Sequence, residues 1–167
     1  MKVLDYINKK GLRVAGFYCP EVRSLGRRIG FKIVSVDMKV ERWLARKEGC
    51  DGPQIGRYKL CNEAVEVASY ASEQASEADV VMIDEIGPME LKMREVKDTI
   101  IRLLDLRKPG IFVVHERLRD PGIRRRLNNR TCWFQVTLDN RDYIIKPILE
   151  AVEEAIERAS SQQLSTT

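Results

Sequence analysis

Apolar and polar positions divide the first third of the chain into one helix and a group of strands. The opening residues form a charged amphipathic stretch, which predicts a helix that Gly11 ends. Farther along, Ile29, Phe31 and Ile33 fall on one face of an alternating segment, which predicts a strand of a β-meander. The expected elements are a helix over residues 1–10, strands over 12–18, 27–37 and 40–45, and a glycine- and proline-rich loop over 46–56.

From residue 62 onward, helical periodicity alternates with short apolar runs. The run over residues 80–83 is continuous and rich in β-branched side chains, which is typical of a parallel strand buried on both faces. Such alternation predicts an α/β fold, a parallel sheet with helices on its faces and the meander as an insertion or edge feature. We expect one domain over residues 1–159 and a flexible polar tail over 160–167. The expected helices cover residues 62–76, 90–106, 121–128 and 140–159, and the expected strands cover 80–83, 110–115 and 132–137.

The composition excludes several classes of protein. The chain has 167 residues, 44% hydrophobic and 32% charged, which excludes a disordered tail or a collagen-like repeat. No apolar run approaches the ~18 residues of a membrane span, and the start shows no signal-peptide core, so we expect a soluble, cytoplasmic protein. The net charge of +4 arises from 29 basic and 25 acidic residues. Such a mixed surface suits anionic ligands such as phosphates without requiring nucleic acid.

The four cysteines and the single histidine give no pattern of a metal site. Cys19, Cys50, Cys61 and Cys132 form no C-x-x-C pair, so scattered zinc ligands are not expected. A disulfide framework is not expected either, because the printed residues show no secretory signal. We expect small buried or half-buried thiols.

The strongest local feature is an apolar strand that ends in two carboxylates. Val80, Val81, Met82 and Ile83 are followed directly by Asp84 and Glu85. Ligands of open parallel sheets bind at this end of the strands, where the first carboxylate could hold Mg²⁺ and the second could orient or deprotonate a water. The alternative is that the acidic pair merely caps the following helix.

A matching phosphate-binding loop is not present within the printed residues. The motif G-x-x-x-x-G-K-[ST] cradles phosphates with backbone N–H groups and a lysine. Gly11 and Gly16 have the correct spacing, but Phe17 and Tyr18 follow in place of Lys and Ser or Thr. No other glycine pair fits.

Several short segments in order resemble the thermophile and cancer-related nucleoside-triphosphatase family of P-loop proteins. That family shows GF[YW]-x-x-E-[VM]-R, R-x-GF, G-x-Y, D-E-I-G-K-M-E-L and a late N-R-D. The corresponding segments here are GFYCPEVR (16–23), RIGFKI (28–33), GRY (56–58), VVMIDEIGPMEL (80–91) and NRD (140–142).

The resemblance implies a RecA-like P-loop fold that binds ATP or GTP with Mg²⁺ and hydrolyses it to nucleoside diphosphate and phosphate. It makes residues 80–87, including Ile86 and Gly87, the second nucleotide-binding segment. Asp84 would be the Mg²⁺ ligand and Glu85 the general base. Arg23 and Arg28 would lie on the meander near the active face. The family's lysine after D-E-I-G is Pro88 here, and the first glutamate of its E-E-[VM]-R is Pro20.

The resemblance also suggests that the start of the family pattern is missing. In the family a strand, the phosphate loop and a helix precede the G-F-Y segment, whereas this sequence begins inside that helix. We therefore expect a start-truncated chain with impaired or no activity. The missing central strand would lie between the strands at 110–115 and 132–137. Its loss would open a slot with unpaired backbone groups, each costing about 1–3 kcal/mol.

Other polar residues carry weaker signals with open alternatives. Arg117 and Arg119 follow a strand end and are candidates for stabilising charge that develops on phosphate. His115 could contact the γ-phosphate or could simply end its strand. Arg141 could face the base or a phosphate, while Asn140 is a plausible N-cap of the last helix. The cluster Arg124, Arg125, Arg126 and Arg130 is favoured as a solvated helix face over a nucleic-acid contact.

Three functions follow from these observations. The leading one is a Mg²⁺-dependent nucleoside triphosphatase. We expect it to be a monomer that binds a nucleoside triphosphate and does not associate with a membrane. The second is a non-catalytic relative that serves as a binding module. The third is an RNA-binding or RNA-modifying P-loop protein that uses residues 117–130, with salt-dependent affinity.

Overall fold

The sheet combines a parallel centre with an antiparallel meander. A computed structural model describes residues 2–128 and 132–164, and within them eight strands form one sheet in the order β5-β6-β4-β3-β1-β7-β8, with β2 paired to β3. The elements are α1 (Lys2–Lys9), β1 (Val14–Tyr18), β2 (Glu21–Ser24), β3 (Arg27–Ser35), β4 (Glu41–Arg46), β5 (Gln54–Ile55), β6 (Tyr58–Leu60), α2 (Ala64–Gln74), β7 (Val80–Ile86), α3 (Pro88–Lys92), α4 (Arg94–Asp105), β8 (Gly110–Val114), α5 (Pro121–Asn128) and α6 (Ile145–Leu164).

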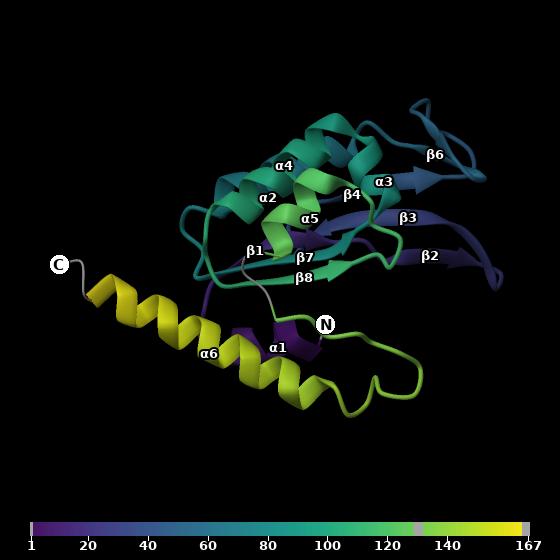
Figure 1. The fold of residues 1–167 in the computed structure, drawn as a ribbon. Helices are drawn as coiled ribbons and strands as arrows, with labels where there is room; N and C mark the ends of the chain where they lie inside the picture. The colour runs from purple at the N-terminus through teal and green to yellow at the C-terminus, as the bar shows by residue number, and fades with distance from the viewer. Residues whose placement is uncertain (1, 129–131, 165–167) are drawn as a thin grey trace.

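The parallel centre is formed by β1, β7 and β8. Strand β7 pairs in parallel with β1 on one side and with β8 on the other. Helices α2 and α4 cover one face of this centre, and α1 and α6 lie on the other (Figure 1). Val80, Val81 and Ile83 are therefore fully buried, as the continuous apolar run predicts. The expected α/β fold is confirmed.

The meander extends the sheet beyond β1. Strand β3 is antiparallel to β1, β2 and β4, and β4 continues to β6 and β5. The pattern predicted β1, β3 and β4 but gave no signal for β2, whose residues are mostly exposed and hence lack alternation. Phe31 packs edge-on against Tyr58, with ring centroids 5.4 Å apart, and joins the meander to the main core.

Helix positions follow the periodicity with one break. The expected helix over 90–106 begins earlier and is divided into α3 and α4 at Met93, whose backbone is extended (φ −92°, ψ 114°). Helix α5 has the predicted bounds, and α2 lies within the predicted range. No described helix is long and apolar enough to cross a membrane.

The expected strand over 132–137 is wrong. These residues are irregular, and β8 is the last strand of the sheet within the described residues. Trp133 and Val136 are 55% and 61% exposed. A β-prone segment forms a strand only where a neighbour pairs with it, and none lies beside this one. The sheet therefore ends at β8, and the expected slot between two strands does not form.

The C-terminal helix differs from its prediction at both ends. Residues 138–144 form turns, so α6 begins at Ile145 instead of residue 140 and continues to Leu164 instead of residue 159. Asn140 is not its N-cap, because the Asn140 carboxamide oxygen accepts a hydrogen bond from the Thr137 amide within the turn. Residues 165–167 of the expected tail lie outside the described part.

A disulfide joins Cys50 to Cys61, against the expectation of free thiols. Their Cα atoms lie 4.9 Å apart although the two cysteines are 11 positions apart in sequence. The pairing of β4 with β6 folds the intervening loop back on itself, so the two cysteines meet through tertiary structure and not through spacing. Cys19 and Cys132 are free.

Candidate functional site

The two adjacent carboxylates lie where β7 ends at the edge of the parallel centre. Asp84 is in register with Tyr18 of β1 and with Val113 of β8. The pairing with β8 then shifts between Asp84 and Ile86, so Glu85 sits in a bulge without a register partner on β8. Bulges re-aim side chains at the ends of strands. The sequence motif and the fold therefore place both carboxyl groups at the sheet edge used by ligands of open α/β sheets.

Burial shifts the ionisation of both groups in the same direction. It raises the pKa of Asp84, and it also raises the pKa of Glu85, where the nearby His115 opposes the shift. His115 is held there because its backbone N–H donates to the Ile86 carbonyl at 3.1 Å. The residue after β8, His115, therefore lies near Glu85. The sequence placed this histidine at a strand end but did not predict that it would lie near Glu85.

Asp84 has the chemistry of a magnesium ligand. Its side chain makes no hydrogen bond or ion pair with any described residue, so its oxygens remain available at the sheet edge. No group of three or more potential metal ligands occurs in the described residues. One carboxylate completed by waters and phosphate oxygens is how Mg²⁺ commonly binds in nucleotide enzymes, so the site fits this ion without further protein ligands.

A buried glutamate beside this pair escaped the sequence analysis. Glu90 of α3 is 4% exposed, and its carboxylate accepts the Gly87 amide at 3.0 Å. Gly87 is the N-cap of α3, and Glu90 lies three residues later, in the position of a capping box. That spacing, together with the proline that begins the helix, was the signal in the sequence that could have identified Glu90.

The two arginines of the meander share one ion-pair partner and do not pair with the carboxylates of β7. Arg23 and Arg28 both form ion pairs with Glu21. Arg23 also donates to the Gly26 carbonyl at 3.0 Å, which closes the β2–β3 turn. Neither arginine forms an ion pair with Asp84 or Glu85. They lie on the hairpin that continues from β1, as the resemblance implies.

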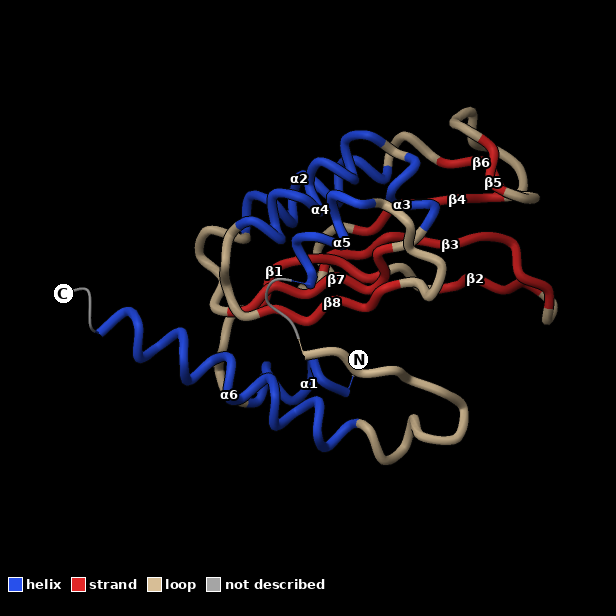
Figure 2. The backbone as a smooth tube through the Cα atoms, viewed as in Figure 1, coloured by secondary structure: helices blue, strands red, loops and turns tan. Residues whose placement is uncertain are grey.

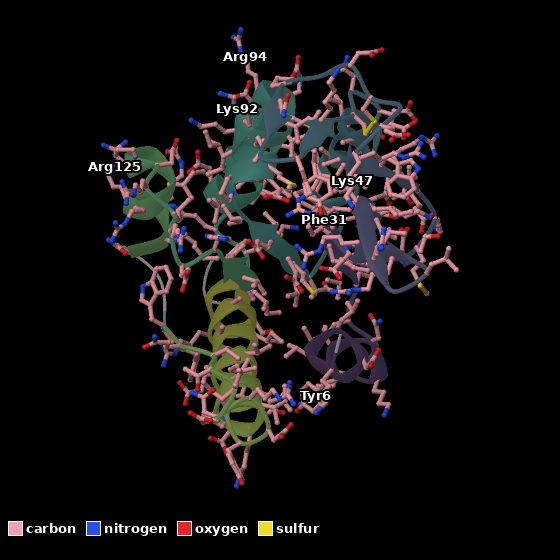
Figure 3. The ribbon with its side chains drawn as sticks, turned by 90° about the vertical axis from the view of Figure 1, so that its right-hand side faces the viewer. Tyr6, Phe31, Lys47, Lys92, Arg94 and Arg125 are labelled. Carbon is pink, nitrogen blue, oxygen red and sulfur yellow. A yellow bond between two sulfur atoms is a disulfide. The ribbon has the colours of Figure 1, made fainter. Side chains whose placement is uncertain are left out.

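The remaining candidate arginines are scattered. Arg117 follows β8, pairs with Glu116 and has a 79% exposed side chain. Arg141 lies in the turns before α6. Figure 2 shows this segment on the side of the sheet that carries α1 and α6. Arg126 is bound by Asp105. Figure 3 shows Arg125 on the α5 side of the view and Lys47 on the meander side, so these two basic residues do not belong to one patch. Arg130 lies outside the described residues.

Comparisons with known proteins agree with this geometry. The sequence model of a family described as NTPase matches residues 1–149. The nucleoside-triphosphatase THEP1 of Hyperthermus butylicus is 52% identical over 159 residues, which are 95% of this chain and 85% of that protein. The nucleoside-triphosphatase THEP1 of Ignicoccus hospitalis is 45% identical over 151 residues, 90% of this chain and 86% of that protein.

A solved structure agrees as well. The solution structure of a human cancer-related nucleoside triphosphatase matches with a TM-score of 0.69 at 27% identity, covering 92% of this chain and 89% of that one. This likeness extends over nearly the full length of both chains and agrees with the α/β fold. This chain belongs to the NTPase family of nucleoside-triphosphatases.

Proposed function

We propose that the protein hydrolyses a nucleoside triphosphate, ATP or GTP, to the nucleoside diphosphate and phosphate. The observation that carries the proposal is the pair Asp84 and Glu85 at the end of a strand buried between two parallel neighbours. The family membership and the high identity to named nucleoside-triphosphatases support it. The printed residues contain no G-x-x-x-x-G-K-[ST] loop, so the proposal assigns roles only to residues 80–87 and their surroundings.

Asp84 would hold Mg²⁺, because its carboxylate is half-buried at the ligand-binding edge and has no partner among the described residues. When bound there, Mg²⁺ neutralises charge on the β- and γ-phosphates. The side chain of Asp84 must be ionised for this role. Its burial raises the pKa, so loss of binding is expected as the pH falls toward the acid range.

Glu85 would position the attacking water and accept its proton. The water oxygen forms a bond to the γ-phosphorus, and the bond from that phosphorus to the β–γ bridging oxygen breaks. A pKa raised by burial brings this carboxylate closer to the strength of a useful base near neutral pH. Arg117, three residues after the end of β8, is the arginine that we assign to charge developing on the phosphate. Arg23 and Arg28 of the hairpin are both paired with Glu21, so the proposal assigns them no direct contact with the phosphates.

The Glu85→Gln variant of the purified protein, compared with wild type, tests the proposal. Phosphate release from ATP or GTP with Mg²⁺ should fall by about 10²–10⁴-fold, because removal of a general base costs that much. Glu95→Gln, an exposed residue of α4, is the matched control and should hydrolyse at the normal rate. Unchanged turnover in Glu85→Gln would reject the role of Glu85. Wild-type protein that binds nucleotide without releasing phosphate would favour the non-catalytic binding module.

A further inference from the structure

The direction of the Glu85 side chain depends on the residues that follow it. Its position in the bulge leaves it without a register partner on β8. No described residue gives its carboxylate a hydrogen bond. The connection from β7 to α3 is therefore the element that orients this side chain. This connection consists of Ile86, which is fully buried, and Gly87, which caps α3.

The carboxylates of Glu85 and Glu90 crowd the same side of Gly87. A Cβ built on Gly87 would lie 2.8 Å from Oε1 of Glu85 and 2.9 Å from Oε2 of Glu90. The backbone of Gly87 is extended (φ −134°), so the need for glycine comes from this lack of space and not from its dihedral angles. Oε2 of Glu90 also accepts the Gly87 amide at 3.0 Å. The Glu90 carboxylate therefore holds Gly87, the residue against which the Glu85 carboxylate lies.

Glu90 also lies close to the end of the neighbouring strand. The Cys19 thiol, directly after β1, lies close enough to the Glu90 carboxylate that the charge of this carboxylate adds to burial in raising the pKa of the thiol. The backbone N–H of Cys19 donates to the Asp84 carbonyl. Glu90 thus connects α3 with the end of β1, and the same segment of β1 is tied to the end of β7. Burying a carboxylate this deeply costs free energy unless hydrogen bonds compensate for the lost water. An apolar side chain at this position would avoid that cost but could not accept the Gly87 amide.

We propose that Glu90 is a positioning residue that holds the Glu85 carboxylate at the end of β7 through the Gly87 amide. The inference rests on the proposed role of Glu85 in hydrolysis. Glu90 faces the carboxylate of Glu85 and the thiol of Cys19, and it is buried away from solvent, so it does not contact water or nucleotide itself. Burial, helped by the charge of Glu85, raises the pKa of Glu90 to about 7, which lessens the repulsion between the two carboxyl groups at neutral pH.

Two substitutions separate the hydrogen bond from the charge. Glu90→Gln keeps an acceptor for the Gly87 amide but loses the charge. Glu90→Asp keeps the charge but shortens the side chain, so it no longer reaches that amide. We expect Glu90→Asp to lower kcat by about 10–100-fold with little change in KM, the usual cost of losing a residue that orients a reacting group. We expect Glu90→Gln to keep kcat within about threefold of wild type, because its side chain still accepts the Gly87 amide.

A second variant reaches the same contact from the other side. Gly87→Ala leaves Glu90 intact but places a methyl group against both carboxylate oxygens. It should lower kcat about as much as Glu90→Asp does, again without a matching rise in KM. Glu95→Gln is the matched control, with kcat and KM expected to remain those of the wild type.

Amide exchange provides a readout that does not require activity. Hydrogen exchange at the Gly87 amide should be faster in Glu90→Asp than in wild type or Glu90→Gln, because only the shortened side chain leaves that amide without its acceptor. Wild-type kcat in folded Glu90→Asp would overturn the proposal, as would a loss in Glu90→Gln equal to that in Glu90→Asp. If the wild type shows no hydrolysis, the proposed function fails, and the exchange rates still report whether Glu90 holds the loop.

Discussion

Strand β7 and the segment over residues 132–137 have similar apolar content but different structures. Val80, Val81 and Ile83 of β7 have no exposed surface, whereas Trp133 and Val136 are more than half exposed. β7 has paired strands on both sides and helices on both faces (Figure 1). Among the described residues, no strand lies beside the later segment. The difference teaches that a β-prone sequence becomes a strand only where the fold supplies partners for its backbone.

The same difference separates the chemistry of the two regions. The end of β7 is held by contacts from β1, β8 and α3, so its carboxylates are partly buried and have raised pKa values. The turns that carry Arg141 are stabilised mainly by local hydrogen bonds, such as that between Thr137 and Asn140. A site that must hold two reacting groups in fixed geometry belongs in the first region and not in the second.

The largest expected effect is in the middle of β7. Ile83→Ala removes a fully buried side chain from the main core and should lower the free energy of unfolding by about 2–5 kcal/mol. Urea denaturation of the variant and the wild type measures this difference. A loss below about 1 kcal/mol would mean that β7 is packed no better than an exposed segment.

The buried carboxylate of Glu90 on α3, beside the end of β7, should make stability depend on pH. The pKa of Glu90 is raised from 4.5 to about 7, so between these values the folded state keeps a proton that the unfolded state releases. The free energy of unfolding should therefore fall as the pH rises through this window, by roughly 3 kcal/mol in total. Below about pH 4.5 the stabilising effect is fully present.

Glu90→Gln should remove this dependence. Denaturation curves of wild type and Glu90→Gln at several pH values measure it, since other titrating groups such as Asp37 and Asp120 cancel in the comparison. Parallel pH profiles for the two proteins would contradict the raised pKa of Glu90.

A smaller effect is expected where α6 contacts the sheet. Val152 packs with Ile7 of α1 and Val80 of β7 in a separate small cluster and is 9% exposed. Val152→Ala should cost about 1.5 kcal/mol, from two buried methyl groups. Hydrogen exchange in α6 should also become faster than in α4. An effect as large as that of Ile83→Ala would show that α6 belongs to the main core.

The smallest effect is expected in the irregular segment. Val136→Ala shortens a side chain that is 61% exposed and should change the free energy of unfolding by less than about 0.5 kcal/mol. The same urea denaturation applies. A loss above about 1 kcal/mol would show that the segment is packed against a partner in solution and would abolish the contrast with β7.

Several features were predictable because their causes are local. The helical periodicity over 121–128 and the continuous apolar run before Asp84 depend on spacing within one element, and the structure confirms both. The same apolar run located the acidic strand end, and the family motifs agree with it. Glu90 was not identified as a site residue, because a glutamate in a helix is usually exposed and only packing shows that this one is not.

Other features depended on contacts between distant residues. The disulfide of Cys50 and Cys61 forms because β4 and β6 pair, and the break of the helix at Met93 and the shifted start of α6 also escaped periodicity. Arg23 and Arg28 looked like free cations in the sequence, but a shared glutamate across the hairpin engages both.

The residue pattern alone established the α/β class, most elements and the position of Asp84 and Glu85, because hydrophobic spacing and strand-end chemistry are properties of short segments. Tertiary structure decided that residues 132–137 are not a strand, that Cys50 meets Cys61, and that Glu90 lies buried beside Glu85. Each of these depends on which backbone or side chain lies opposite, and a linear pattern contains no information about a partner far away in the chain.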